Sequence, residues 1–200
     1  MGIDWGTCDE RLHAASTAAI RQFAGECPDE PICFFAFDTE PRYGYVLIAF
    51  DTLANNVRQS KALEAFANEQ RRKYLTAAEA WRSAKHMLSS PFLSAFSTNS
   101  GGFAYPQYAE VQFPEWTQLA EQGGYPVGLA HEDDYLDSSA RLMLWRVAER
   151  LIADRAFDTL TLASPFMVGY GIHDEEEAIL RLLNWPTRAE PEVAPDCGGM

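Results

Sequence analysis

Basic residues are scarce in this chain. Its 200 residues include 16 Lys and Arg against 29 Asp and Glu, which gives a formal net charge of −13. A protein that binds the phosphate backbone of a nucleic acid needs a basic face, so we expect no nucleic-acid partner. The negative charge favours a cationic partner. Solubility alone is the simpler explanation of this charge, because net charge governs solubility and association rather than fold.

Long apolar runs are missing too, and no stretch approaches the roughly 20 residues that a membrane-spanning helix needs. The first residues, MGIDWGTCDERLHAAS, hold acids early and lack the apolar segment of a secretory signal. We therefore expect no association with a membrane and a cytoplasmic location. No pattern in the sequence indicates an oligomeric state.

Cysteine is rare, and the four that occur form no CxxC pair and lie at no zinc-finger spacing from a histidine. A reducing compartment fits this usage. Cys33 lies in an apolar run, which favours a small core residue. A Cys27–Cys33 disulfide remains open as an alternative.

Catalytic signatures are also absent: the chain has no P-loop, no GxGxxG between strand and helix, no GxSxG and no HExxH. Its histidines, His13, His86, His131 and His173, are spread widely along the sequence. We therefore predict no catalytic residue, no metal and no cofactor. A metal-assisted enzyme that uses His131 or His173 with nearby carboxylates is kept as an alternative.

Apolar residues are plentiful, at 47% of the chain, and their spacing predicts the elements. Helical spacing predicts helices over 9–25, 58–75, 76–88, 114–124 and 135–153, the last capped by Asp134 or Asp137. Apolar runs predict strands over 31–39, 43–52, 103–113 and 158–171, the first two joined as a hairpin across Pro41. The predicted fold is α+β, with a small, mostly antiparallel sheet packed by several helices. One domain is expected over 1–186, with a disordered tail over 187–200.

The stretch GYGIHDEEEAILRLLNWP, residues 169–186, places a histidine and four acids before an apolar pattern. Asp174 suits a helix N-cap, and glutamates in the first turn favour the helix dipole. We therefore predict a helix with Ile179, Leu182 and Leu183 facing inward. A functional cluster is the alternative, and His173 has no structural explanation. Its members are His173, Asp174, Glu175, Glu176 and Glu177.

The segment AHEDDYLD, residues 130–137, also groups a histidine with acids. Carboxylates can bind a hard cation, but the glycine and the terminal glutamate of an EF-hand loop are missing. A loop that leads into an acidic helix start explains the pattern without a metal.

A wider feature is the span between Lys85 and Arg141, which has no Lys or Arg but many acids and aromatic residues. Such a segment suits a docking face for a basic partner, where aromatic side chains act as anchors. The alternative is that its aromatic residues belong to the core. The predicted partner-binding residues are Glu121, Glu132, Asp133, Asp134, Asp137, Trp116, Tyr125 and Tyr135.

Three places in the sequence together resemble the bacterial family called domain of unknown function 4303. They are the early segment FFAFDTEPRYGYVLIAFDT, the FPEW segment with Trp116, and the closing FMVGYGIHDEEEAILRLLNWP. The resemblance spans about residues 10–186 and is weakest over 53–100. It implies a small cytoplasmic protein, often encoded near polymorphic toxins, with an immunity role. Asp174, Glu175 and Glu176 match its closing motif, and no catalytic residues come with it.

Together these observations predict a non-enzymatic, immunity-type protein. It would bind and neutralise a basic toxin through an acidic, aromatic surface. A small-ligand-binding or regulatory module with a pocket beside the sheet is the main alternative.

Overall fold

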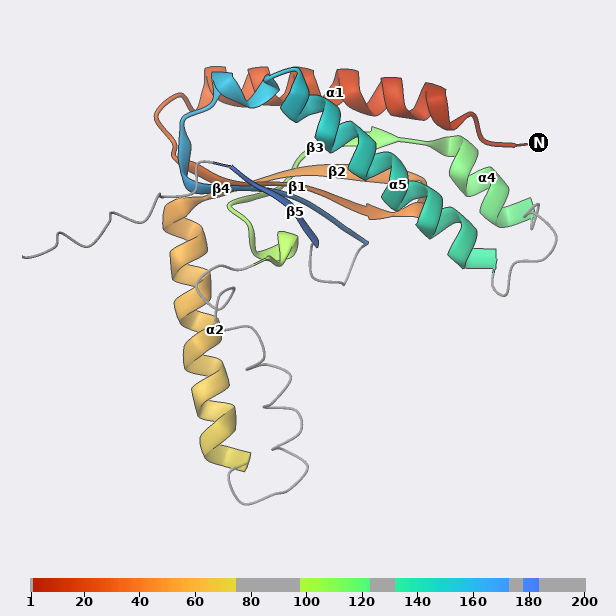
Figure 1. Cartoon of the computed structure of the whole chain (residues 1–200). Coiled ribbons are helices and arrows are strands. Elements are labelled where there is room, and N and C mark those ends of the chain that lie inside the picture. Colours follow the sequence, from red (N-terminus) through yellow and green to blue (C-terminus); the bar gives the residue numbers. More distant parts are fainter. Residues whose placement is uncertain (1, 75–97, 123–131, 173–177, 184–200) are drawn as a thin grey trace, which may run out of the picture.

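The computed structural model describes residues 2–74, 98–122, 132–172 and 178–183, and these residues confirm the α+β prediction. Helices and strands are intermixed along the chain rather than alternating regularly (Figure 1). The elements are α1 (Trp5–Glu26), β1 (Ile32–Glu40), η1 (Pro41–Tyr43), β2 (Tyr45–Thr52), α2 (Leu53–Tyr74), η2 (Ser100–Gly102), β3 (Tyr105–Gln112), α4 (Pro114–Gln122), α5 (Glu132–Ala153), η3 (Ala156–Thr159), β4 (Leu162–Ile172) and β5 (Ala178–Leu183).

The strands form one sheet in the order β3-β2-β1-β4-β5. β1 and β2 make the predicted antiparallel hairpin, and β3 and β5 add antiparallel edges. β4 lies parallel to β1, so the sheet is mixed, although three of its four pairings are antiparallel. Pro106 is tolerated in β3 because β3 is an edge strand, where a missing amide donor breaks no inner ladder.

The larger core lies between the sheet and the helices α1 and α5, which cover the same face (Figure 1). Leu12, Ile20 and Phe23 follow the helical repeat of α1, and all three are fully buried. The Phe23 ring stacks on Phe50 of β2 with centroids 4.4 Å apart. Burying one such side chain contributes roughly 1.5–3 kcal/mol, so this apolar stripe accounts for the helix prediction over 9–25.

The opposite face of the sheet, from which α2 projects, is built from smaller residues around Phe34 (Figure 1). Ala36 and Ala49 are fully buried there, and the Phe103 ring lies 5.0 Å from that of Phe34. The small side chains leave room for segment 99–104 to lie against the strands.

The buried carboxylate of Asp51 holds one end of that segment and the start of α2. Its Oδ1 accepts hydrogen bonds from Asn55 Nδ2 at 2.7 Å and from the Ala104 amide at 3.0 Å. Its Oδ2 accepts a third from Asn56 Nδ2 at 2.7 Å. A buried carboxylate is stable only with such partners, so Asp51 joins β2, α2 and the start of β3 in one network.

Asp38 of β1 anchors the other end of the same segment. Its Oδ2 accepts a hydrogen bond from Ser100 Oγ at 2.8 Å, and both side chains are buried. Asn55 Nδ2 also donates to the Gly102 carbonyl at 2.8 Å. The two carboxylates therefore fix the η2 turn across the sheet.

The hairpin turn depends on Gly44, which has a φ of 68° in the left-handed region. Its carbonyl accepts a hydrogen bond from the Phe113 amide at 2.6 Å. A Cβ at this position would lie 2.5 Å from Thr117 Oγ1 and 2.6 Å from the Phe113 carbonyl oxygen. The turn therefore packs directly against the start of α4, where Pro114 occupies the predicted first helical position.

Ion pairs hold α1 against its neighbouring helices. Arg146 Nε lies 3.0 Å from Asp9 Oδ2, and Arg150 Nη1 lies 2.7 Å from Glu10 Oε1. These contacts join α1 to α5. Arg11 Nη1 reaches Glu115 Oε1 of α4 at 3.1 Å. Several of the few arginines are thus paired with acids across element boundaries.

The predicted closing helix is wrong where the structure describes it, because residues 178–183 form the strand β5. β5 pairs antiparallel with β4, with Leu182 opposite Met167 and Leu183 opposite Phe166. Successive side chains therefore alternate between the faces, and Leu182 is 44% exposed instead of facing inward. Pairing with β4 satisfies the backbone and overrides the local helical spacing.

Three smaller predictions are also settled. The helix that starts at Glu132 places Asp134 and Asp137 inside α5, so neither is its N-cap. Cys8, Cys27 and Cys33 are free, which excludes the Cys27–Cys33 disulfide, and Cys33 is buried as predicted. The predicted helix over 76–88 and the tail over 187–200 lie outside the described residues.

Candidate functional site

Trp116 was predicted as an exposed anchor, and the structure corrects this. Its side chain is fully buried and stacks on Phe113 with centroids 4.4 Å apart and an interplanar angle of 11°. The Trp5 ring of α1 packs on its other side at 5.4 Å. The amphipathic pattern of α4 directs Trp116 to the core, as the alternative interpretation of the aromatic residues held.

The other predicted partner-binding residues do not form one described face. Glu121 is exposed near the end of α4, whereas Tyr135 is half-buried and accepts a hydrogen bond from Trp5 Nε1 at 3.4 Å. Asp137 is half-buried in α5. The backbone of 132–134 begins α5, but the side chains of Glu132, Asp133 and Asp134, and all of Tyr125, lie outside the described residues.

The closing cluster also lies outside the described residues: His173, Asp174, Glu175, Glu176 and Glu177. The same is true of His86 and His131. Within the part of the chain that the structure describes, no group of three or more His, Cys, Asp or Glu is arranged to hold a metal ion. Nor do these residues include a helix with the length and hydropathy needed to cross a membrane.

Acidic and aromatic side chains do gather at the turn of the β1–β2 hairpin, and we call this group the hairpin-end surface: Glu40, Tyr43, Tyr45 and Glu110. Glu40 lies opposite Tyr45 in the antiparallel register. Glu110 lies opposite Leu47, one step along the same face of the sheet. Tyr43 is 71% exposed, and its ring lies parallel to Tyr45 with centroids 6.5 Å apart.

The hairpin-end surface places acidic groups around Tyr45, and the exposed Arg42 of η1 lies in the same turn. Partial burial raises the pKa of the Tyr45 phenol, and the charges of Asp38, Glu40 and Glu110 raise it further. The carboxylates therefore act on the same ring that stacks with Tyr43. Gln112 Nε2 donates to Glu110 Oε1, which orients that carboxylate beside Tyr45.

Sequence reasoning noted the parts of this surface but not their assembly. Tyr43 and Tyr45 fall in the predicted hairpin strand over 43–52, whereas Glu110 falls in the separate predicted strand over 103–113. Only the pairing of β2 with β3 brings Glu110 beside the tyrosines. One sequence feature could have indicated this surface. It is a tyrosine in a predicted turn, beside a predicted strand whose two neighbouring strands each carry an acid.

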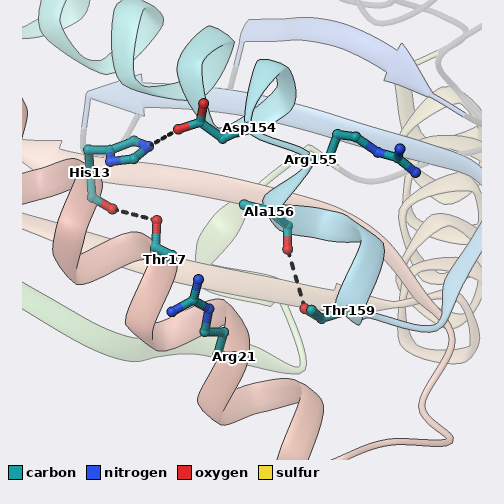
Figure 2. A pocket seen from close by; sticks show the side chains of 7 residues that line it. All are labelled: His13, Thr17, Arg21, Asp154, Arg155, Ala156 and Thr159. Carbon is teal, nitrogen blue, oxygen red and sulfur yellow. Dashed lines mark hydrogen bonds and ion pairs between the residues drawn. The ribbon is translucent and has the colours of Figure 1, made fainter.

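A second feature is a small polar pocket between α1 and the segment that follows α5 (Figure 2). Its volume is about 250 Å³. One wall comes from α1, where residues four apart share a helix face. The lining residues are His13, Thr17, Arg21, Asp154, Arg155, Ala156 and Thr159.

Contacts inside this pocket link its two walls. His13 Nε2 lies 3.0 Å from Asp154 Oδ2. Each threonine hydroxyl donates to a nearby carbonyl, Thr17 to His13 at 2.9 Å and Thr159 to Ala156 at 3.3 Å (Figure 2). Sequence reasoning treated His13 as an isolated histidine, because Asp154 is far away in the sequence.

The chain matches no family model, no curated protein and no solved structure. The resemblance to domain of unknown function 4303 therefore remains a prediction.

Proposed function

We propose that this protein is a non-enzymatic inhibitor of the immunity type, which binds a basic protein, such as a toxin domain, through the hairpin-end surface. The observation that carries the proposal is the exposed Tyr43 ring, stacked on Tyr45 and flanked by Glu40 and Glu110. Tyrosine is enriched among residues that dominate binding energy at interfaces.

The charge distribution supports a basic partner. Arg11, Arg146 and Arg150 are engaged in ion pairs with acids of neighbouring elements. The chain as a whole carries 29 Asp and Glu against 16 Lys and Arg, a formal net charge of −13. Complementary charge accelerates association and suppresses wrong partners, which suits an inhibitor that must capture its target quickly.

The proposed mechanism is occlusion. Tyr43 inserts into a pocket of the partner, and the carboxylates of Glu40 and Glu110 pair with Lys or Arg side chains around it. The partner's basic surface is then unable to reach its own anionic substrate. No chemical step is required of the inhibitor.

Co-purification with the product of the adjacent gene tests this function. We expect a 1:1 complex that is tight at low salt and weaker at high salt, because screening shortens the range of the attraction. Co-expression should also protect cells from that gene product. Absence of a complex at either salt concentration, with no protection, would contradict the inhibitor function.

The location of the surface has its own test. Glu110→Gln removes one charge beside Tyr45, and Asp29→Asn removes one charge from an exposed turn outside it. The Glu110 variant should slow association about threefold at low salt and little at high salt, as rim charges do. An equal effect of both variants would show that only net charge matters.

A further inference from the structure

We infer that the hairpin-end surface binds an arginine side chain of its partner in preference to a lysine, with the guanidinium against the rings of Tyr43 and Tyr45. This preference rests on the inhibitor function proposed above, which requires a basic partner but does not say which kind of cation meets the tyrosines.

The two tyrosine rings are spaced differently from the stacked rings of the core. Phe113 and Trp116 have centroids 4.4 Å apart. Tyr43 and Tyr45 are more nearly parallel, with an interplanar angle of 5°, but their centroids are 6.5 Å apart. Neither ring therefore fully covers the face of the other. A single cation beside the pair can lie within about 6 Å of both centroids, which is the range of a cation–π contact.

The backbone between the two tyrosines is held in place. Gly44 has a φ of 68°, and its carbonyl accepts a hydrogen bond from the Phe113 amide at 2.6 Å. This contact ties the turn to the start of α4. Tyr43 is 71% exposed and Tyr45 is half-buried, so solvent reaches the pair. Rings presented by a fixed backbone lose less conformational entropy when a ligand binds.

Carboxylates beside the rings favour a guanidinium over an ammonium. Burial raises the pKa of the Tyr45 phenol, and the nearby charges of Glu40 and Glu110 raise it further. Glu110 is exposed and accepts a hydrogen bond from Gln112 Nε2. A planar guanidinium can stack on a tyrosine ring while its N–H groups point to a carboxylate at the ring edge. An ammonium is compact and strongly hydrated, so it gains less from the aromatic face.

Titration of the full chain with a blocked arginine amide and a blocked lysine amide tests this preference, because each amide carries one positive charge. NMR shifts of the Tyr43 and Tyr45 rings report binding at constant ionic strength. We expect saturable shifts, with arginine bound about twofold to fivefold more tightly, as a cation–π contact at an exposed site provides. Tyr43→Leu keeps an apolar side chain without the ring, so this variant should bind both amides equally.

Two substitutions that each remove one charge locate the bound cation. Glu110→Gln should weaken arginine binding about twofold to threefold, as loss of an exposed ion pair does. Arg42→Gln should strengthen it, because Arg42 lies in the same turn and repels a cation. Asp29→Asn, in an exposed turn outside the surface, should leave the affinity unchanged.

Three results would overturn the inference: unsaturable shifts, equal wild-type affinities for the two amides, or an arginine preference that survives Tyr43→Leu. None of them bears on complex formation with the adjacent gene product, which tests the inhibitor function separately. Arginine binding at the tyrosines without such a complex would support this site and contradict the proposed function.

Discussion

At the scale of single residues, the buried carboxylate of Asp51 is the centre of a hydrogen-bond network in the described core. It accepts hydrogen bonds from two asparagine side chains and two amides, those of Thr52 and Ala104. Its removal would leave several buried donors without an acceptor. The cost of burying each such donor exceeds the net gain of an ordinary hydrogen bond.

We therefore predict that Asp51→Ala lowers the free energy of unfolding by about 3–5 kcal/mol, because it breaks a buried, charge-assisted network. Urea denaturation measures this change. Asp29→Ala, at an exposed turn, is the matched control and should change stability by less than about 0.5 kcal/mol. A loss below about 1 kcal/mol for Asp51→Ala would contradict the network.

Thiol chemistry also differs from residue to residue. Burial raises the pKa of the Cys8 thiol to about 11, with a further contribution from Glu115. Burial, with the Asp51 charge, raises that of Cys33 to about 12. Both pKa values lie above the ordinary value of 9.0, so the folded protein keeps these thiols protonated at pH 8. These thiols ionise more easily in the unfolded chain than in the folded protein. Their contribution to the free energy of unfolding is therefore lost only as the pH rises above 9.

Labelling with a thiol reagent at pH 8 should therefore modify half-buried Cys27 first, because attack requires an accessible thiolate. A Cys197→Ser background removes the thiol of the tail. Cys8 and Cys33 should react only after urea unfolds the chain. Rapid reaction of all three in the folded protein would be incompatible with the burial of Cys8 and Cys33.

At the scale of elements, the hairpin turn is held by its close contact with α4. A Cβ on Gly44 would approach the Phe113 carbonyl oxygen to 2.6 Å, and the φ of 68° disfavours any side chain. We predict that Gly44→Ala lowers stability by about 2 kcal/mol, by strain and by separation of the turn from α4. Gly25→Ala, where a Cβ has nothing within 4 Å, is the control and should be neutral or stabilising. Equal thermal midpoints for the two variants would refute the close contact.

Substitutions in β5 test whether this segment forms a strand or the helix that the sequence pattern indicated. In a strand, Leu182 and Leu183 point to opposite faces, and only Leu183 packs against the larger core. Leu182→Lys should therefore change stability by less than about 0.5 kcal/mol, whereas Leu183→Lys should cost about 1–3 kcal/mol. Similar large losses for both, measured by urea denaturation, would favour the helix that the sequence pattern indicated.

The same strand shows where sequence reasoning succeeds and fails. The helices over 9–25 and 135–153 were predictable, because long stripes such as Leu136, Ala140, Met143 and Val147 fit one period only. The six residues AILRLL fit either the helical or the strand period, and pairing with β4 decided between the two.

The hairpin-end surface was less predictable than these elements, because β2–β3 pairing brings Glu110 to Tyr45 from a distance in the sequence. Trp116 illustrates the opposite error, because it is predicted as a partner-binding residue but its side chain is fully buried on the inner face of α4.

At the scale of the whole molecule, the acidic chain uses its few cations in two ways. Some join elements, as Arg150 joins α5 to Glu10 of α1, and others line the pocket near His13. The hairpin turn, with its tyrosines and acids, lies at the other end of β1. The hairpin-end surface and the pocket therefore lie at two separate places in the molecule.

The affinity of the Tyr43→Ala variant for the adjacent gene product tests the central claim most directly. Trp145→Ala, which truncates an exposed aromatic residue of α5, is the matched control. Tyr43→Ala should weaken binding by about 2 kcal/mol, or about 30-fold, while the Trp145 variant binds like the wild type. If the gene product binds but Tyr43→Ala binds as tightly as the wild type, the hairpin-end surface is not where this protein meets its partner.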